Sequence, residues 1–237
     1  MATRTRRTER REEPLSRERI VEAAIELLDT AGEGGLTFRA LSERLATGPG
    51  AIYWHVANKG ELLGAATDAV VAAALTVDPA GAPPSPRDGI RLVALGLFEA
   101  SEAHPWLATQ LAAQLSRSPA RTVAPRLFES IGRRVSDLGV PREDWFTAAS
   151  ALMHYILGAA GQNAANIAAT RSLGPGEDRA GFLDAVSRAW EALDPDDYPF
   201  TRAVARQARE HDDRAQFLDG LGLVLDGVTA AAARPQA

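Results

Sequence analysis

The chain of 237 residues contains no cysteine, so it has no disulfide, no thiolate nucleophile and no cysteine-based zinc site. Its four histidines are scattered, and no two have the spacing that places metal ligands on one face of a helix. The sequence also lacks a phosphate-binding glycine loop and a nucleophile elbow. These absences fit a protein of the reducing cytoplasm that needs no metal or other cofactor.

Long hydrophobic runs are missing as well. No uninterrupted apolar run reaches the roughly 18 residues of a membrane-spanning helix, because arginine or aspartate interrupts the best candidates. The N-terminal segment is charged and lacks the apolar core of a secretion signal. We therefore expect a cytoplasmic protein without a membrane partner.

Lysine is nearly absent, since the 26 basic residues are all arginine except Lys59. The net charge is -5, yet residues 1–11 hold five arginines and one glutamate, which leaves a local charge of +4. We interpret residues 1–15 as a disordered basic arm that neutralises DNA phosphates. The alternative is a solvated leader with no role in binding.

Residues 16–64 carry the signals of four helices in close succession. Ser16, Thr37, Gly48 and Asn58 are each of a type that caps a helix N-terminus. A proline follows Gly48, and its missing N–H has no partner at the first helical position in any case. Such crowding is typical of a helix-turn-helix, whose second helix must protrude into a major groove about 12 Å wide. The alternative is an ordinary three-helix core fragment.

Six short motifs lie in this region and near the end of the chain. They are Arg39-Ala-Leu41-Ser-Glu-Arg-Leu45, Gly48-Pro-Gly-Ala-Ile52-Tyr-Trp-His-Val56, Asn58-Lys59 and Leu62-Leu63, and then Tyr198-Pro-Phe200 and Phe217-Leu218-Asp-Gly220. The first four resemble the signature of the Tet-repressor (TetR) family, and the last two resemble its more divergent C-terminal domain. The resemblance implies a transcriptional regulator with a DNA-reading head and a ligand-sensing body.

The resemblance also implies which residues contact operator DNA. In the family, the third helix presents its early residues and exposed aromatic and histidine side chains to the groove. The matching positions, with one residue from the second helix and one from the fourth, are Arg39, Pro49, Gly50, Ala51, Tyr53, His55 and Lys59. The resemblance implies that Ile52 and Trp54 face inward. Because neighbours on a helix point about 100° apart, Tyr53 and Trp54 cannot both be fully buried.

Each DNA-contact prediction has a structural alternative. Tyr53 could be a core aromatic, and His55 could be an ordinary solvated residue. Lys59 stands at the start of the predicted fourth helix, where its ammonium and the helix N-terminus together suit a phosphate. The small residues at positions 49–51 leave the operator sequence unreadable from this chain alone.

Beyond the head, a turn-rich segment at residues 78–86 contains four prolines that no helix can cross. Apolar residues then recur at helical spacing in stretches at about 87–103, 105–116, 122–138, 142–171, 178–192, 200–209 and 211–232. No strand-like alternation accompanies them. We predict an all-α protein with a three-helix DNA-binding domain at 16–64, a connecting helix and linker at 65–85, and a larger ligand-binding and dimerisation domain at 86–233.

Two stretches of the body are too apolar to face water in a monomer, Trp145 to Ile167 and Phe217 to Val228. In the TetR family the corresponding helices pair with those of a second subunit in a four-helix bundle. The resemblance therefore implies a homodimer whose interface includes Gly158, Gly161, Leu218, Leu221 and Leu225. A twofold dimer also suits a palindromic operator with half-sites about 34–36 Å apart. The alternative is that both helices belong to the core of one subunit.

An apolar helical body with scattered polar side chains can enclose a small-molecule pocket. The candidate ligand contacts are His104, Trp106, Gln110, Gln114, His154, Tyr155 and Gln162. His104 precedes a proline, and we interpret it as a residue at a helix start in preference to the metal-chelate role that the resemblance invites there.

The resulting hypothesis is a repressor that a small molecule releases from a palindromic operator. One alternative is a metal-dependent helical enzyme built around His154, His104 or His211-Asp212-Asp213. Another is a DNA-binding protein that responds to no ligand, which predicts weak sequence preference and a body without a cavity.

Overall fold

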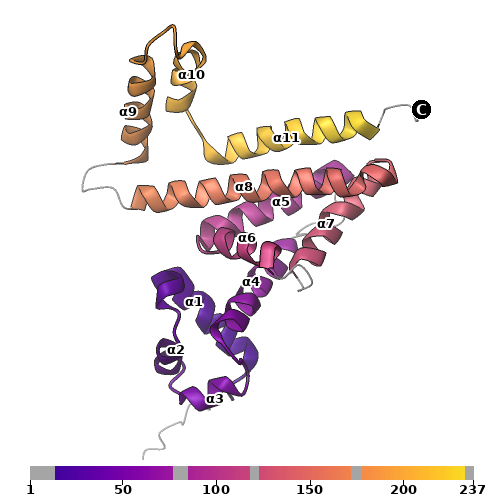
Figure 1. Ribbon diagram of the computed structural model, residues 1–237. Helices are drawn as coiled ribbons and strands as arrows, with labels where there is room; N and C mark the ends of the chain where they lie inside the picture. The colour runs from indigo at the N-terminus through magenta and orange to yellow at the C-terminus, as the bar shows by residue number, and fades with distance from the viewer. Residues whose placement is uncertain (1–13, 77–84, 118–122, 172–177, 233–237) are drawn as a thin grey trace, which may run out of the picture. The chain divides into compact units, whose positions relative to one another are not determined.

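A computed structural model describes residues 14–76, 85–117, 123–171 and 178–232 (Figure 1). All regular structure in these ranges is helical, as predicted. The described part of the chain contains no helix long and apolar enough to cross a membrane. The predicted basic arm, except for its last two residues, and most of the proline-rich linker lie outside the described residues. The chain divides into two compact units, Met1–Ala66 and Thr67–Ala237.

The first unit, the head, contains α1 (Arg17–Gly35), α2 (Phe38–Arg44), α3 (Pro49–Tyr53) and the first part of α4 (Lys59–Thr76). The predicted caps are confirmed. Ser16 and Thr37 accept hydrogen bonds from backbone N–H groups three residues on, at 3.3 and 3.1 Å. Asn58 accepts one from the N–H of Glu61 at 2.9 Å, and the carboxylate of Glu61 accepts one from the N–H of Ala57 at 2.9 Å. These bonds satisfy donors that a helix start leaves unpaired.

The first helix contains one non-helical residue near its end. Gly32 has a non-helical backbone with φ +64°, a conformation that glycine adopts without strain, but a further turn continues to Gly35. Ile20, Leu36 and Ile52 are among the fully buried side chains of the head. They come from α1, the α1–α2 connection and α3, so the apolar stripes of the short helices meet in one small core.

The second unit, the body, contains the remainder of α4 and seven further α-helices among the described residues. They are α5 (Pro86–Ala103), α6 (Leu107–Arg117), α7 (Val123–Asp137), α8 (Trp145–Arg171), α9 (Arg179–Glu191), α10 (Pro199–Arg209) and α11 (Asp213–Ala232). A 3-10 turn, η1 (Arg142–Asp144), precedes α8. The helix α6 begins two residues later than predicted. His104 ends α5 by donating its N–H to Ala100 and accepts from the N–H of Leu107, each at 2.8 Å.

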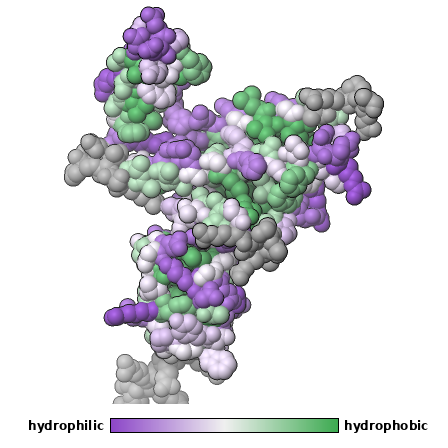
Figure 2. Space-filling view, viewed as in Figure 1, coloured by the Kyte–Doolittle hydropathy of each residue, from purple (hydrophilic) through white to green (hydrophobic). Residues whose placement is uncertain are grey.

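The long helix α8 is central to the body and packs against α5, α6, α7 and α11 (Figure 1). Leu152 and Ile156 of α8, Leu97 of α5 and Leu221 of α11 lie in this core, each exposed by 2% or less. The helices α9 and α10 pack chiefly against each other. Figure 2 shows hydrophobic side chains at the surface of this hairpin. Phe182 and Phe200 of the hairpin are exposed.

Candidate nucleic-acid interface and polar pocket

The short helix α3 has one buried side and one exposed side. Ile52 is fully buried and Val56, one turn later, is almost so, and these two side chains anchor the helix in the head. Pro49 and Gly50 are exposed at its start. Tyr53 is 53% exposed, and its ring stacks on that of Phe38 with centroids 4.4 Å apart and planes 11° from parallel. The stack fixes the ring while leaving its outer part accessible.

The prediction that Trp54 faces inward is wrong, because its side chain is 90% exposed. The reason lies in how α3 ends. Trp54 is the C-cap residue, and the N–H groups of both His55 and Val56 return to the carbonyl of Ile52, at 2.9 and 3.0 Å. This turn brings Val56 over Ile52, and the two aliphatic chains fill the inward side. The indole is therefore left beside Tyr53 on the outer surface.

Three predicted DNA contacts make hydrogen bonds within the head. Arg39 is exposed and pairs with Glu43 one turn away at 3.0 Å, an ion pair worth about 0.3–0.5 kcal/mol that a phosphate can replace. Lys59 donates from Nζ to the carbonyl of Glu33 at 2.5 Å and so ties the start of α4 to the end of α1. The carbonyl of His55 accepts a hydrogen bond from Arg17 at 3.0 Å.

Arg17 is a residue that the sequence analysis missed. Its guanidinium also pairs with Glu61 at 2.9 Å, so it joins the start of α1 to the α3–α4 turn. No sequence signal distinguishes Arg17 from its many neighbouring arginines. Its role depends on the packing of α1 beside α4.

In the body, a pocket of about 680 Å³ lies between α8, α10 and α11, with Phe98 of α5 at its base. One wall is aromatic. The rings of Phe98 and Phe217 stack with centroids 4.4 Å apart, and Tyr155 lies 5.9 Å from Phe217. The hydroxyl of Tyr155 donates to the carbonyl of Phe217 at 2.9 Å. Burial raises the pKa of Tyr155, and the nearby charge of Asp219 raises it further, so the phenol stays protonated.

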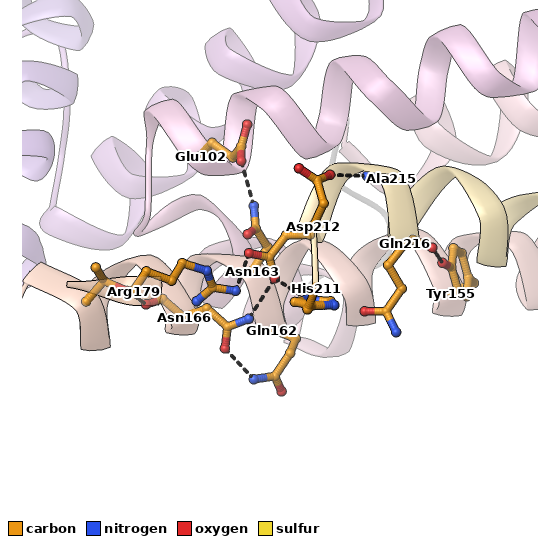
Figure 3. A network of polar contacts seen from close by, with 12 residues as sticks. Glu102, Tyr155, Gln162, Asn163, Asn166, Arg179, His211, Asp212, Ala215 and Gln216 are labelled. Atoms are coloured by element: carbon orange, nitrogen blue, oxygen red, sulfur yellow. Dashed lines mark hydrogen bonds and ion pairs between the residues drawn. The ribbon is translucent and has the colours of Figure 1, made fainter. Parts of the chain in front are cut away.

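Polar side chains of the lining, among them Gln162, Asn166 and His211, belong to a network of hydrogen bonds and ion pairs that Figure 3 shows. Asp213 accepts hydrogen bonds from Asn166 at 3.0 Å and pairs with His211 at 2.9 Å and with Arg179. Gln162 donates to Asn166 at 3.0 Å. The network joins α8, the start of α9 and the start of α11, three segments that are distant in sequence.

The charge of the pocket follows from its lining. Glu210, Asp212, Asp213 and Asp219 contribute carboxylates, and the described lining residues include no lysine or arginine. Asp213 is paired with Arg179 and Glu210 with Arg206, two arginines outside the lining, and Asp212 caps α11 by accepting from the N–H of Ala215 at 2.6 Å, which leaves Asp219 without an arginine partner among the described ion pairs. A pocket with one aromatic wall and an acidic rim suits a flat ligand that is neutral or cationic and carries hydrogen-bond donors.

The structure brings together only part of the predicted ligand set. Tyr155 and Gln162 line the pocket, but His104, Trp106, Gln110, Gln114 and His154 do not. Trp106 and Gln110 are each only 8% exposed and lie within the helical core, and His154 is exposed on α8. Sequence alone did not reveal Asp213 as the centre of the network, because α8 and α11 meet only in the folded chain.

The residues of the predicted dimer interface differ in their burial within the chain. Leu221 and Leu225 are both 0% exposed, so they pack inside the body of this chain. An added Cβ at Gly161 would lie 3.9 Å from Ala108 of α6, which places Gly161 against its own chain. Gly158 is exposed and Leu218 is half-buried, so both remain accessible. Leu223, which was not predicted, is 75% exposed on the same helix as Leu218.

The residues of the proposed metal enzyme do not converge. Among the described residues, no three His, Asp or Glu side chains are grouped so that they could hold a metal ion. His154 is exposed on α8, His104 ends α5, and His211 lies between α10 and α11.

Two family profiles match this chain and together cover most of it. The profile described as "Bacterial regulatory proteins, tetR family" matches residues 20–66. The profile described as "Tetracyclin repressor-like, C-terminal domain" matches residues 85–232. The chain belongs to the TetR family of transcriptional regulators. As a TetR-family regulator, the protein binds DNA through the helix-turn-helix of its head.

Relatives extend the likeness over nearly the whole chain. An HTH-type transcriptional regulator of Saccharopolyspora erythraea is 30% identical over 218 residues, which cover 92% of this chain and 86% of that protein. The class A tetracycline repressor from transposon 1721 of Escherichia coli is 28% identical over 211 residues, or 88% of each protein. The solved structure of the TetR regulator SCO7222 of Streptomyces coelicolor is 69% identical with a TM-score of 0.83, and the match covers 92% of this chain and 100% of that chain.

Proposed function

We propose that this TetR-family regulator is a cytoplasmic homodimeric repressor that a small molecule releases from palindromic operator DNA. The observation that carries the proposal is the exposed face at α3. The side chains of Tyr53 and Trp54 are exposed to solvent there, while Ile52 is buried and anchors the helix in the head. Large apolar side chains exposed beside each other mark an interaction surface. The repressor activity and the ligand response are supported by the relative named as a tetracycline repressor.

The DNA-contact set is Arg39, Pro49, Gly50, Ala51, Tyr53, His55 and Lys59, to which we add Trp54. The small residues at the start of α3 allow its backbone to approach the groove closely. Tyr53 and Trp54 then contact sugar, phosphate or thymine methyl groups at one side of the reading helix. Lys59 gives the phosphate backbone a cation at the start of α4, next to backbone N–H groups of the helix end.

We place the second subunit on the exposed side of α8 and α11. Gly158 of α8 leaves room for the close approach of another helix, since an added Cβ there would have no neighbour within 4 Å. Leu218 and Leu223 of α11 supply apolar surface that water otherwise covers, and Leu223 also lines the pocket, so the second subunit lies at the edge of the pocket. A twofold axis through this face presents two heads to two half-sites about one helical turn of DNA apart.

The effector site is the pocket between α8, α10 and α11. Its ligand packs on the ring of Tyr155, which is only half-buried, and donates hydrogen bonds to the carboxylate and amide side chains of the rim. Release from DNA requires that the ligand bind more tightly to the DNA-free conformation than to the DNA-bound one. A coupling free energy of about 1–3 kcal/mol, typical of allosteric proteins, changes operator affinity about 5- to 150-fold.

The experiment has two stages. Operator duplexes are first selected from a random pool with the purified protein, and compounds that raise its melting temperature are found separately. Each such compound is then added to the protein–operator complex in a gel-shift assay. We expect flat cationic compounds to release the DNA, and Tyr155→Ala to abolish their effect while leaving operator affinity unchanged. If every compound that occupies the body leaves DNA binding intact, the protein is a DNA-binding protein without a ligand response.

A further inference from the structure

The last turn of α4 lies directly against the middle of α5. A Cβ atom built on Gly96 of α5 would lie 2.4 Å from the carbonyl oxygen of Ala74 and 3.3 Å from its carbonyl carbon. Both atoms belong to backbone, so a side chain on residue 96 requires that one of the two helices move. By contrast, a Cβ on Gly132 in the middle of α7 would have no neighbour within 4 Å.

One face of the second half of α4 is buried. Thr67, Val70, Val71 and Ala74 are all buried, at the three- and four-residue spacing of one helix face. Glycine inside a helix is less favourable than alanine. At Gly96 the missing side chain has a specific consequence, because it lets α4 approach α5 closely at a carbonyl of its last turn.

The helix α4 is also the element that carries the chain from the head into the body, since it begins at Lys59 in one unit and ends at Thr76 in the other. We propose that Gly96 is a positioning residue for operator binding: it sets where α4 docks on α5 and thereby how the two heads of a dimer are spaced on DNA. This inference rests on the dimeric DNA binding proposed above. It does not depend on the identity of the effector.

The size of the effect follows from the contact. Ordinary van der Waals contact begins at 3.4 Å, so an alanine at position 96 displaces the carbonyl of Ala74 by about 1 Å. At a rise of about 1.5 Å per residue, the head end of α4 lies about 22 Å from this contact. Because α4 is one continuous helix from Lys59 to Thr76, a shift or tilt at Gly96 moves the whole helix, including the end that enters the head. The same shift in both subunits changes the distance between the two heads, and therefore the half-site spacing of the DNA that the dimer binds.

The test compares Gly96→Ala with the matched control Gly132→Ala, which adds the same methyl group to another helix interior. Duplexes are selected with the wild-type protein from a random pool, and affinities are measured for the full palindrome and for a duplex with one half-site. We expect Gly96→Ala to lose about tenfold in affinity for the full palindrome, equivalent to about 1.4 kcal/mol. Its affinity for the single half-site stays within about twofold, because α3 is untouched. Reselection with this variant yields a different half-site spacing, and Gly132→Ala behaves as wild type.

Circular dichroism and thermal melting show first whether Gly96→Ala folds. If it does not, Val71→Ala replaces it, since this substitution loosens the buried face of α4 without a clash and should broaden the range of half-site spacings accepted. The inference is overturned if the folded variant keeps its affinity for the palindrome, or loses equal affinity for palindrome and half-site. A wild-type protein that selects no duplex contradicts the proposed function itself, which is a separate outcome.

Discussion

Replacing Trp54 with alanine tests the exposed face of α3 most directly. Trp54 and Ile52 are two residues apart, yet one is 90% exposed and the other is fully buried. The pair therefore separates a contribution to DNA binding from a contribution to folding. Trp54→Ala should weaken DNA binding and leave the head stable, whereas Ile52→Ala should destabilise the head.

The expected stability changes follow from burial. A tryptophan side chain buries up to about 250 Å² when fully enclosed, so a tenth of it corresponds to about 25 Å². At about 25 cal/mol per Å², Trp54→Ala costs about 0.6 kcal/mol of unfolding free energy. Removing a fully buried isoleucine costs about 2–5 kcal/mol, because the change also leaves a cavity.

The assay is urea unfolding followed by circular dichroism, with operator affinity measured by fluorescence anisotropy on the selected duplex. We expect Trp54→Ala to lose about tenfold in operator affinity, or about 1.4 kcal/mol, and Trp54→Phe to recover part of it. An unfolding free energy lowered by 2 kcal/mol or more in Trp54→Ala would show that the indole packs inward. Unchanged operator affinity in a stable variant would remove Trp54 from the interface.

Three further substitutions address the body and the phosphate contacts. Gly220→Ala should destabilise the protein by about 1–3 kcal/mol in urea unfolding, because the new Cβ would lie 2.2 Å from the hydroxyl of Tyr155, and the penalty should vanish in a Tyr155→Ala background. Lys59→Ala should weaken binding to all duplexes alike and lower the slope of log affinity against log salt by about one, and an unchanged slope would refute the phosphate contact. Leu223→Glu should yield a folded monomer in analytical ultracentrifugation, whereas Leu221→Ala should lower stability by about 2–5 kcal/mol without changing the oligomeric state.

The features that the sequence predicts correctly depend on short-range interactions. Ser16, Thr37 and Asn58 cap their helices because a side-chain oxygen reaches an N–H three residues on, and no distant residue is needed. The spacing of apolar residues along the body likewise predicts its helices, because the apolar face of each helix can be recognised from residues that are close together in the sequence. The motifs from Arg39 to Leu63 then identify the head as a DNA-binding one.

What the tertiary structure alone decides is which helix faces meet. The apolar stripe of α11 is evident in the sequence, but only its packing in the body shows that Leu221 and Leu225 are buried within this chain while Leu223 is exposed. The orientation of Trp54 depends on where a five-residue helix ends, a matter of one hydrogen-bonded turn that periodicity cannot resolve. Asp213 and Asn166 are 47 residues apart along the chain, and they form a hydrogen bond in the pocket lining because α8 and α11 lie side by side. Local patterns determine helices, whereas contacts between distant segments create the sites.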